Sequence, residues 1–162
     1  CRVSDSSLLV SDSRGCVYSM SVAQNRIVVQ SQMNLGETVT ALSKWIHLDD
    51  INCDVYIGIT SKGSIQSFIT GIDNALFESM EKLQKELETF LVKNGELSHF
   101  NYRAIYSPAY RESYEKYVDV TFLMGFQDLE DDDKAEIIAK SGITNADSIF
   151  ELINSISKLN VQ

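Results

Sequence analysis

The sequence is poor in the residues that build metal sites and disulfide frameworks. Its 162 residues include only three cysteines (Cys1, Cys16 and Cys53) and two histidines (His47 and His99). The cysteines lack the spacing of metal ligands, and an odd number is a poor basis for a disulfide framework, so we expect a reducing, intracellular compartment. Neither histidine sits near a cysteine in a nucleophile-like setting. A catalytic pair of Cys53 and a histidine is an open alternative, but no feature of the sequence favours it.

Basic clusters and long apolar runs are also missing. The chain has 14 basic and 23 acidic side chains, for a net charge of −9. Surfaces that bind phosphates need clustered Lys and Arg, so we expect no direct contact with nucleic acid. No apolar run approaches the ~20 residues of a membrane span, so we expect no membrane partner. A hydrophobic content of 44% predicts a folded globular protein.

Catalytic signatures are absent as well. The sequence has no Gly-rich phosphate loop, no serine elbow and no HExxH motif, so we expect neither an enzyme nor a cofactor. The acidic run Glu130–Asp133 could bind a divalent cation through its carboxylates. It lacks the alternating ligands and central glycine of a calcium loop, and a solvated helix start is the favoured interpretation.

What the sequence does contain is a hairpin that leads directly into a long helix. Residues 55–60 and 65–69 are β-branched and apolar, and Gly63 lies in the turn between them, which predicts two antiparallel strands. Apolar residues then recur every three or four positions, as on one face of an amphipathic helix: Phe77, Met80, Leu83, Leu87, Phe90 and Leu91. Asp73 or Asn74 can cap this helix, and Asn94-Gly95 can end it.

The residues before this hairpin predict further short strands at regular spacing. Extended structure is expected over residues 7–11, 16–22, 26–33 and 38–42, with Gly-containing turns between several of these segments. Such a pattern is typical of propeller blades or of a small sandwich. A blade uses four strands over ~40–45 residues, so about one to two blades of a larger propeller fit here. The chain begins without methionine, within strand-like sequence, and we expect it to be a segment of something longer.

The residues after the hairpin predict a helical domain. Pro108 marks a break, and a second helix is expected from Glu112 to Gln127. A third follows the acidic run and ends at Ser141-Gly142, and a fourth begins near Thr144. We therefore expect two domains: terminal β-propeller blade strands in residues 1–72, and a small C-terminal helical domain in residues 73–162 that packs on them.

Tyrosines gather around the proline break. Tyrosine combines rigid apolar area with a polar tip, so these side chains could form a groove for a partner. Packing of helices on the sheet is the more ordinary explanation, and both can hold for different residues. The candidate partner-binding residues are Tyr102, Arg103, Tyr106, Tyr110 and Tyr114.

The order of four segments resembles the C-terminal region of the CPSF A subunit family. They are the strand phrase Tyr56–Ile65, the long helix, Phe100-Asn101-Tyr102-Arg103, and Tyr117-Val118-Asp119 with Phe122 and Phe126 after it. In the family, a Gly–Asp follows the aspartate that Asp119 matches. Val120 and Thr121 stand there in this chain. Asn34–Glu37 also resembles a strand-end phrase of the damaged-DNA-binding branch.

The resemblance implies a scaffold. Family members have three β-propellers and a C-terminal helical domain, and this chain would be the end of the third propeller with those helices. In the damaged-DNA-binding branch, such a protein is the adaptor of a cullin-RING E3 ubiquitin ligase in the nucleus. It joins substrate receptors to the ligase in DNA repair or heterochromatin silencing, and the cullin binds parts absent from this chain. The alternatives are a scaffold of a splicing or 3′-end cleavage and polyadenylation complex, and a free-standing α+β trafficking adaptor module.

Overall fold

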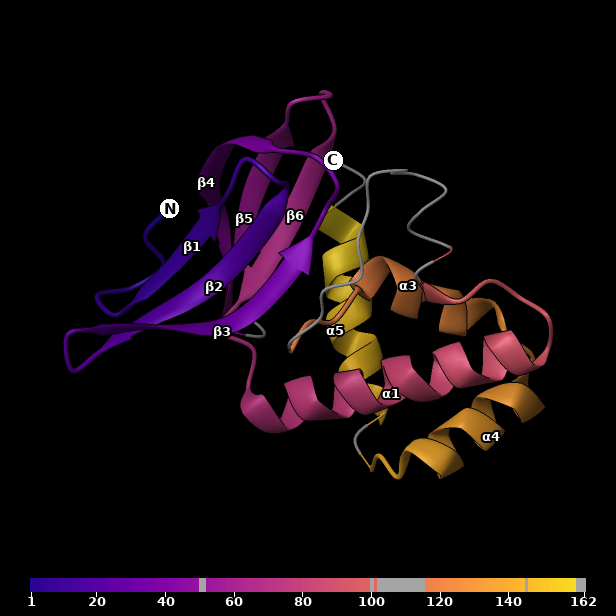
Figure 1. Ribbon diagram of the computed structural model, residues 1–162. Helices are drawn as coiled ribbons and strands as arrows, with labels where there is room; N and C mark the ends of the chain where they lie inside the picture. The colour runs from indigo at the N-terminus through magenta and orange to yellow at the C-terminus, as the bar shows by residue number, and fades with distance from the viewer. Residues whose placement is uncertain (50–51, 100, 102–115, 145, 160–162) are drawn as a thin grey trace. The chain divides into compact units, whose positions relative to one another are not determined.

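The computed structural model describes residues 1–49, 52–99, 101, 116–144 and 146–159, and the side chains of those up to residue 155 (Figure 1). The chain divides into two compact units. The first contains Cys1–Ile72, and the second contains Asp73–His99 and Val118–Gln162.

The first unit is made of two antiparallel sheets, each with three strands. Their orders are β1-β2-β3 and β4-β5-β6, so each strand pairs with the next one in sequence. This confirms the predicted antiparallel strands. That the sheets are blades of a propeller stays a prediction. The strands are β1 (Ser7–Ser11), β2 (Cys16–Ala23), β3 (Arg26–Asn34), β4 (Val39–Leu48), β5 (Cys53–Thr60) and β6 (Ile65–Thr70).

Strand β4 is longer than the sequence predicted. Extended structure was expected to residue 42, but pairing with β5 continues to Leu48 opposite Cys53. A shift in register between Lys44 and Ile46 leaves Trp45 as an extra residue, which is the geometry of a β-bulge. The bulge interrupts the two-residue alternation of side chains, so the sequence did not indicate that the strand continues through residues 43–48.

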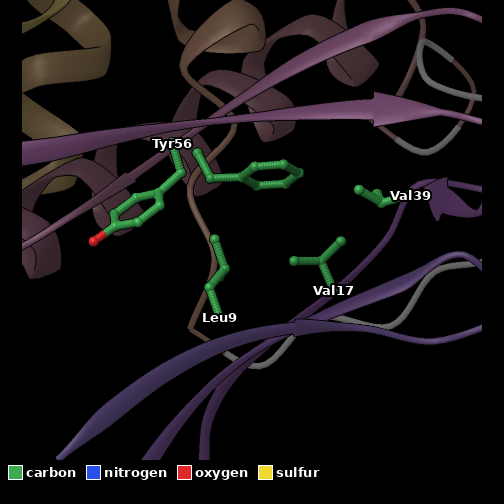
Figure 2. Packing of buried hydrophobic residues seen from close by; sticks show 5 residues of the cluster. Leu9, Val17, Val39 and Tyr56 are labelled. Atoms are coloured by element: carbon green, nitrogen blue, oxygen red, sulfur yellow. The ribbon is translucent and has the colours of Figure 1, made fainter. Parts of the chain in front are cut away.

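A hydrophobic core lies between the two sheets. Leu9 and Val17 project from the first sheet toward Val39 and Tyr56 of the second (Figure 2). Phe68 completes the buried cluster from β6. It packs closely on β5, since a Cβ added at Gly58 would lie 2.8 Å from its ring. The glycine in the strand phrase Tyr56–Ile65 therefore leaves room for an aromatic ring of this core.

The second unit is helical. Helix α1 begins at the predicted cap, since Asp73 accepts hydrogen bonds from the amides of Ala75 and Leu76. It ends in a Schellman motif, in which Gly95 takes a φ of +80° and the Glu96 amide donates to the Leu91 carbonyl. The described elements are α1 (Asn74–Lys93), α3 (Val120–Met124), the 3₁₀ turn η2 (Gly125–Asp128), α4 (Asp131–Ser141) and α5 (Ala146–Leu159).

The helix expected over Glu112–Gln127 is correct from Val120 onward, but its start is wrong within the described residues. Lys116 has a φ of +53°, and α3 begins only at Val120, capped by Asp119. A side chain that caps a helix cannot also lie inside it, so the aspartate sets the later start. The unit's core contains the apolar positions of each helix: Met80, Leu83, Leu87, Phe122, Leu123, Phe126, Ile137, Ile149, Leu152 and Ile153.

Candidate functional site

The predicted partner-binding residues lie outside the described part of the chain. Their role therefore stays a prediction. The structure describes residues before and after the segment that holds them, among them His99 and Asp119. The residues concerned are Tyr102, Arg103, Tyr106, Tyr110 and Tyr114.

His99 and Asp119 form a buried polar pair in the helical unit. His99 Nε2 lies 2.7 Å from Asp119 Oδ2, and both side chains are almost completely buried. The other oxygen of Asp119 accepts a hydrogen bond from the Phe122 amide and so caps α3. The His99 ring also contacts the Phe122 ring, with centroids 4.8 Å apart. One carboxylate therefore serves both the histidine and the start of a helix.

Helix α1 holds both members of this pair. The Asp119 amide donates to Oε1 of Gln84 over 2.6 Å, and the His99 amide donates to Oε1 of Glu88 over 3.0 Å. Gln84 and Glu88 are four residues apart and so lie on one face of the helix. We call these four residues the His99–Asp119 clasp. It joins the two segments of the helical unit, at the end of the first (His99) and near the start of the second (Asp119).

Sequence reasoning missed the clasp. Asp119 entered only through the family resemblance, and His99 was considered only as a partner for a cysteine. The available signal was the cap pattern, an aspartate three residues before Phe122 at the start of an apolar run. No sequence signal indicated that His99 would meet it, because 20 residues separate them.

A second polar cluster surrounds Glu37 in the sheet unit. Its Oε2 accepts hydrogen bonds from the hydroxyls of Thr60, over 2.6 Å, and Ser64, over 2.9 Å. Lys62 Nζ lies 3.5 Å from the other oxygen. The Thr60 hydrogen bond lowers the pKa of Glu37, and Ser64 and Lys62 lower it further, against the opposing effect of burial.

The chain around Glu37 is held from two sides. The Leu35 amide donates to the Gly15 carbonyl, and the Thr38 hydroxyl donates to the Ser13 carbonyl, both in the β1–β2 turn. The Ser61 amide, in the β5–β6 turn, donates to the Thr38 carbonyl. The segment Asn34–Thr38 therefore joins turns of both sheets.

The thiol of Cys53 is a poor nucleophile. Burial raises its pKa, and the charge of Asp54 raises it further. His47 is engaged elsewhere, because its Nδ1 lies 2.7 Å from Asp54 Oδ1. Lys44 and then His47 lower the pKa of Asp54 by hydrogen bonding. The structure therefore does not support the alternative of a Cys53 nucleophile activated by a histidine.

The acidic run forms the first turn of α4. Asp131, Asp132 and Asp133 follow Glu130 at the helix start, where negative charge meets the positive end of the helix dipole. Within the described residues, no group of three or more His, Cys, Asp or Glu side chains could hold a metal ion. In the same part of the chain, no helix has the length and apolar character needed to cross a membrane.

The described residues form two meandering antiparallel sheets, a long capped helix and a helical unit with a buried clasp. A family model, the CPSF A subunit region, matches residues 3–128, which is more than three quarters of the chain. The chain therefore belongs to the CPSF A subunit family, as its four segments predicted. Among curated proteins, no match to the chain is found. Proteins of this family are scaffold-type subunits, are not known as enzymes and are generally nuclear.

Proposed function

We propose that this chain is the C-terminal segment of a multi-propeller adaptor in a nuclear cullin-RING E3 ubiquitin ligase complex. The adaptor links substrate receptors to the ligase in DNA repair or heterochromatin silencing, and the cullin binds other parts of it. Residues 1–72 supply terminal blade strands, and residues 73–162 form the helical domain that packs on them. Membership of the CPSF A family carries this proposal. The phrase Asn34–Glu37 favours the ligase branch.

The strand pairing supports the propeller part of the proposal. Cys1–Val3 runs along the free edge of β1, where Arg2 forms a bridge with Leu8 and the Cys1 carbonyl accepts from the Leu9 amide. With β1, β2 and β3, this gives four adjacent antiparallel segments, the number in a propeller blade. A second meander, β4-β5-β6, follows directly.

A scaffold of a splicing or 3′-end processing complex is the second candidate, because the family match favours both branches equally. Family membership also favours either scaffold over the free-standing trafficking module.

Affinity purification of the tagged intact protein with mass spectrometry separates these functions. Recovery of a cullin with substrate receptors selects the ligase adaptor. Recovery of splicing or 3′-end factors without a cullin selects the second candidate, and recovery of no stable partner contradicts both.

The predicted contact residues can be tested in the same purification. Arg103→Ala and Tyr106→Ala should each lower partner recovery, since truncating a central interface residue costs about 1 kcal/mol or more. Lys82→Ala, at an exposed position of α1, is the matched control and should leave recovery unchanged.

A further inference from the structure

Two hairpins of the sheet unit, β1–β2 and β5–β6, have the same turn. In the first turn, the Asp12 amide donates to the Cys16 carbonyl over 2.9 Å, and Asp12 Oδ1 accepts from the Cys16 amide over 2.9 Å. In the second turn, the Thr60 amide donates to the Ser64 carbonyl over 2.9 Å, and Thr60 Oγ1 accepts from the Ser64 amide over 3.1 Å. The hairpin therefore occurs twice, and β6 is the counterpart of β2.

The two hairpins differ in what lies beside their second strand. Strand β2 pairs with β1 on one edge and with β3 on the other, whereas β6 has only β5 as a neighbour among the described strands (Figure 1). Each turn contains a glycine of the same conformation, with a φ of +84° at Gly15 and +85° at Gly63. A Cβ added at Gly15 would lie 2.7 Å from the amide nitrogen of Glu37, in the chain that follows β3, but one at Gly63 would meet nothing within 4 Å. As far as the structure describes the chain, the place that β3 takes beside β2 is therefore open beside β6.

Strand β6 lacks the features that protect a free edge. Natural edge strands carry charged residues, prolines or bulges, which prevent further pairing. Strand β3 has Arg26 and a bulge in its pairing with β2, and β4 has Lys44 and a bulge at Trp45. Strand β6 contains no charged residue and no proline, and its pairing with β5 has no shift in register. Its edge is therefore suited to a further strand.

We propose that the free edge of β6 pairs with an extended segment of the intact protein that lies outside these 162 residues, in the place that β3 takes beside β2. The inference rests on the proposed function, because a multi-propeller adaptor has further strands to supply. The residues directly after β6 cannot form this strand, since Asp73 caps α1 three positions after Thr70. A strand of the same polypeptide is favoured over a separate chain, because the tether gives it a high effective concentration at the edge.

Backbone hydrogen bonds, and not charges, hold the added strand. Thr60 and Ser64 form a hydrogen-bonded pair, and such pairs alternate with non-hydrogen-bonded ones along an antiparallel ladder. Gln66 and Phe68 therefore bond to β5, and the amides of the alternate residues point to the open edge. These amides are those of Ile65, Ser67 and Ile69. Arg26 is the only charged residue of β3, so we expect an almost uncharged segment that runs antiparallel to β6.

Hydrogen–deuterium exchange of the intact protein, read at single amides, tests whether this edge is covered. The amides of Ile65, Ser67 and Ile69 should exchange at least about a hundredfold more slowly than in an unfolded peptide, as those of Gln66 and Phe68 do. Ser67→Pro removes one edge donor and keeps the pairs with β5, so it should speed exchange at Ile65 and Ile69 at least about fivefold. Ser67→Ala keeps the amide and is the matched control, in which exchange should not change. If Ser67→Pro does not fold, the rates in the wild type and in Ser67→Ala still decide.

Photo-crosslinking identifies the segment. The crosslinking residue p-benzoylphenylalanine, placed at position 67 of the intact protein, should link to a segment of the same polypeptide outside these 162 residues, which mass spectrometry of the linked peptides locates. No crosslink, or crosslinks only to a second copy, to another protein or within the 162 residues, overturns the proposal.

Fast exchange at Ile65, Ser67 and Ile69 beside slow exchange at Gln66 and Phe68 also overturns it, as does equal exchange in a folded Ser67→Pro variant and in Ser67→Ala. The recovery of a cullin or of RNA-processing factors does not depend on these amides. The pairing of the β6 edge can therefore fail while the scaffold function stands.

Discussion

His99 Nε2 lies 2.7 Å from Oδ2 of Asp119, and this buried pair joins two points of the chain that are 20 residues apart. Helix α1 supports both ends through Glu88 and Gln84. The pair therefore joins the end of one segment of the helical unit to the start of the other, and Asp119 caps α3.

Variants of Asp119 should separate its two roles. Asn caps helices as well as Asp, so Asp119→Asn should keep the cap of α3 and lose only the charge beside His99. Asp119→Ala should lose both, with a further cost of about 1 kcal/mol for the cap. His99→Gln should cost about 1.5–3 kcal/mol, the usual value for a hydrogen bond to a charged group. Chemical denaturation measures all three, and equal stability of Asp119→Asn and Asp119→Ala would contradict the capping role.

Gly15 should tolerate substitution less well than a glycine of the same conformation elsewhere. Gly15 and Gly63 have φ values of +84° and +85°, so Ala at either position incurs the strain of a left-handed backbone, about 1–2 kcal/mol. An added Cβ at Gly15 would also lie 2.7 Å from the Glu37 amide nitrogen, while one at Gly63 meets nothing within 4 Å. Thermal unfolding should thus show a clearly larger loss for Gly15→Ala. Similar losses would mean that the β1–β2 turn can move away from Glu37.

Glu37 should contribute stability that is lost on acidification. Its pKa in the folded state lies below the ordinary value of 4.5, so the unfolded chain binds the proton more readily. The contribution is present above that ordinary value and disappears as the pH falls through the folded-state pKa. At neutral pH, Glu37→Gln should cost about 1–2 kcal/mol, and it should flatten the acid side of the stability curve.

Glu136→Gln provides the control for this pH profile. Lys140 lowers the pKa of Glu136 by hydrogen bonding, but this ion pair is exposed on α4 and screened by solvent. Denaturant midpoints measured over an acidic pH series should change little in this variant. An acid response of Glu37→Gln that matches the wild type would show that the Glu37 cluster does not stabilise the fold.

The buried stripe of α1 should dominate the stability of the helical unit. Leu87 is completely buried, and Leu87→Ala should cost about 2–5 kcal/mol through lost burial and the cavity left behind. Val92→Ala, at an exposed position near the end of the same helix, should change stability by less than about 1 kcal/mol. Equal effects in urea denaturation would mean that α1 does not pack through this stripe.

The sequence predicted the elements whose signals are local. Helix α1 begins at the Asp73 cap and ends at Gly95, as predicted, because caps and positive-φ glycines act on residues only a few positions away. The turns at Gly15 and Gly63 were predicted for the same reason. The length of β4 was not predicted, because the bulge at Trp45 breaks the two-residue alternation while pairing with β5 continues past it.

The candidate site could not be predicted in this way, because its central contact joins residues that are 20 positions apart. Tyrosines were favoured there because their chemistry suits a partner surface, but no local pattern pairs His99 with Asp119. That contact depends on α1 and α3 being packed in one unit, which is a long-range property. The family resemblance marked Asp119 only because it compared the order of several segments at once.

Cryo-electron microscopy of the intact protein tests the central claim most directly. The account predicts that β1-β2-β3 and β4-β5-β6 are neighbouring blades of a closed ring, with another sheet of the same chain covering Met20 and Val29. A self-contained pair of sheets, with that side of β1-β2-β3 open to solvent and no ring around it, would contradict the scaffold assignment and the ligase function that depends on it.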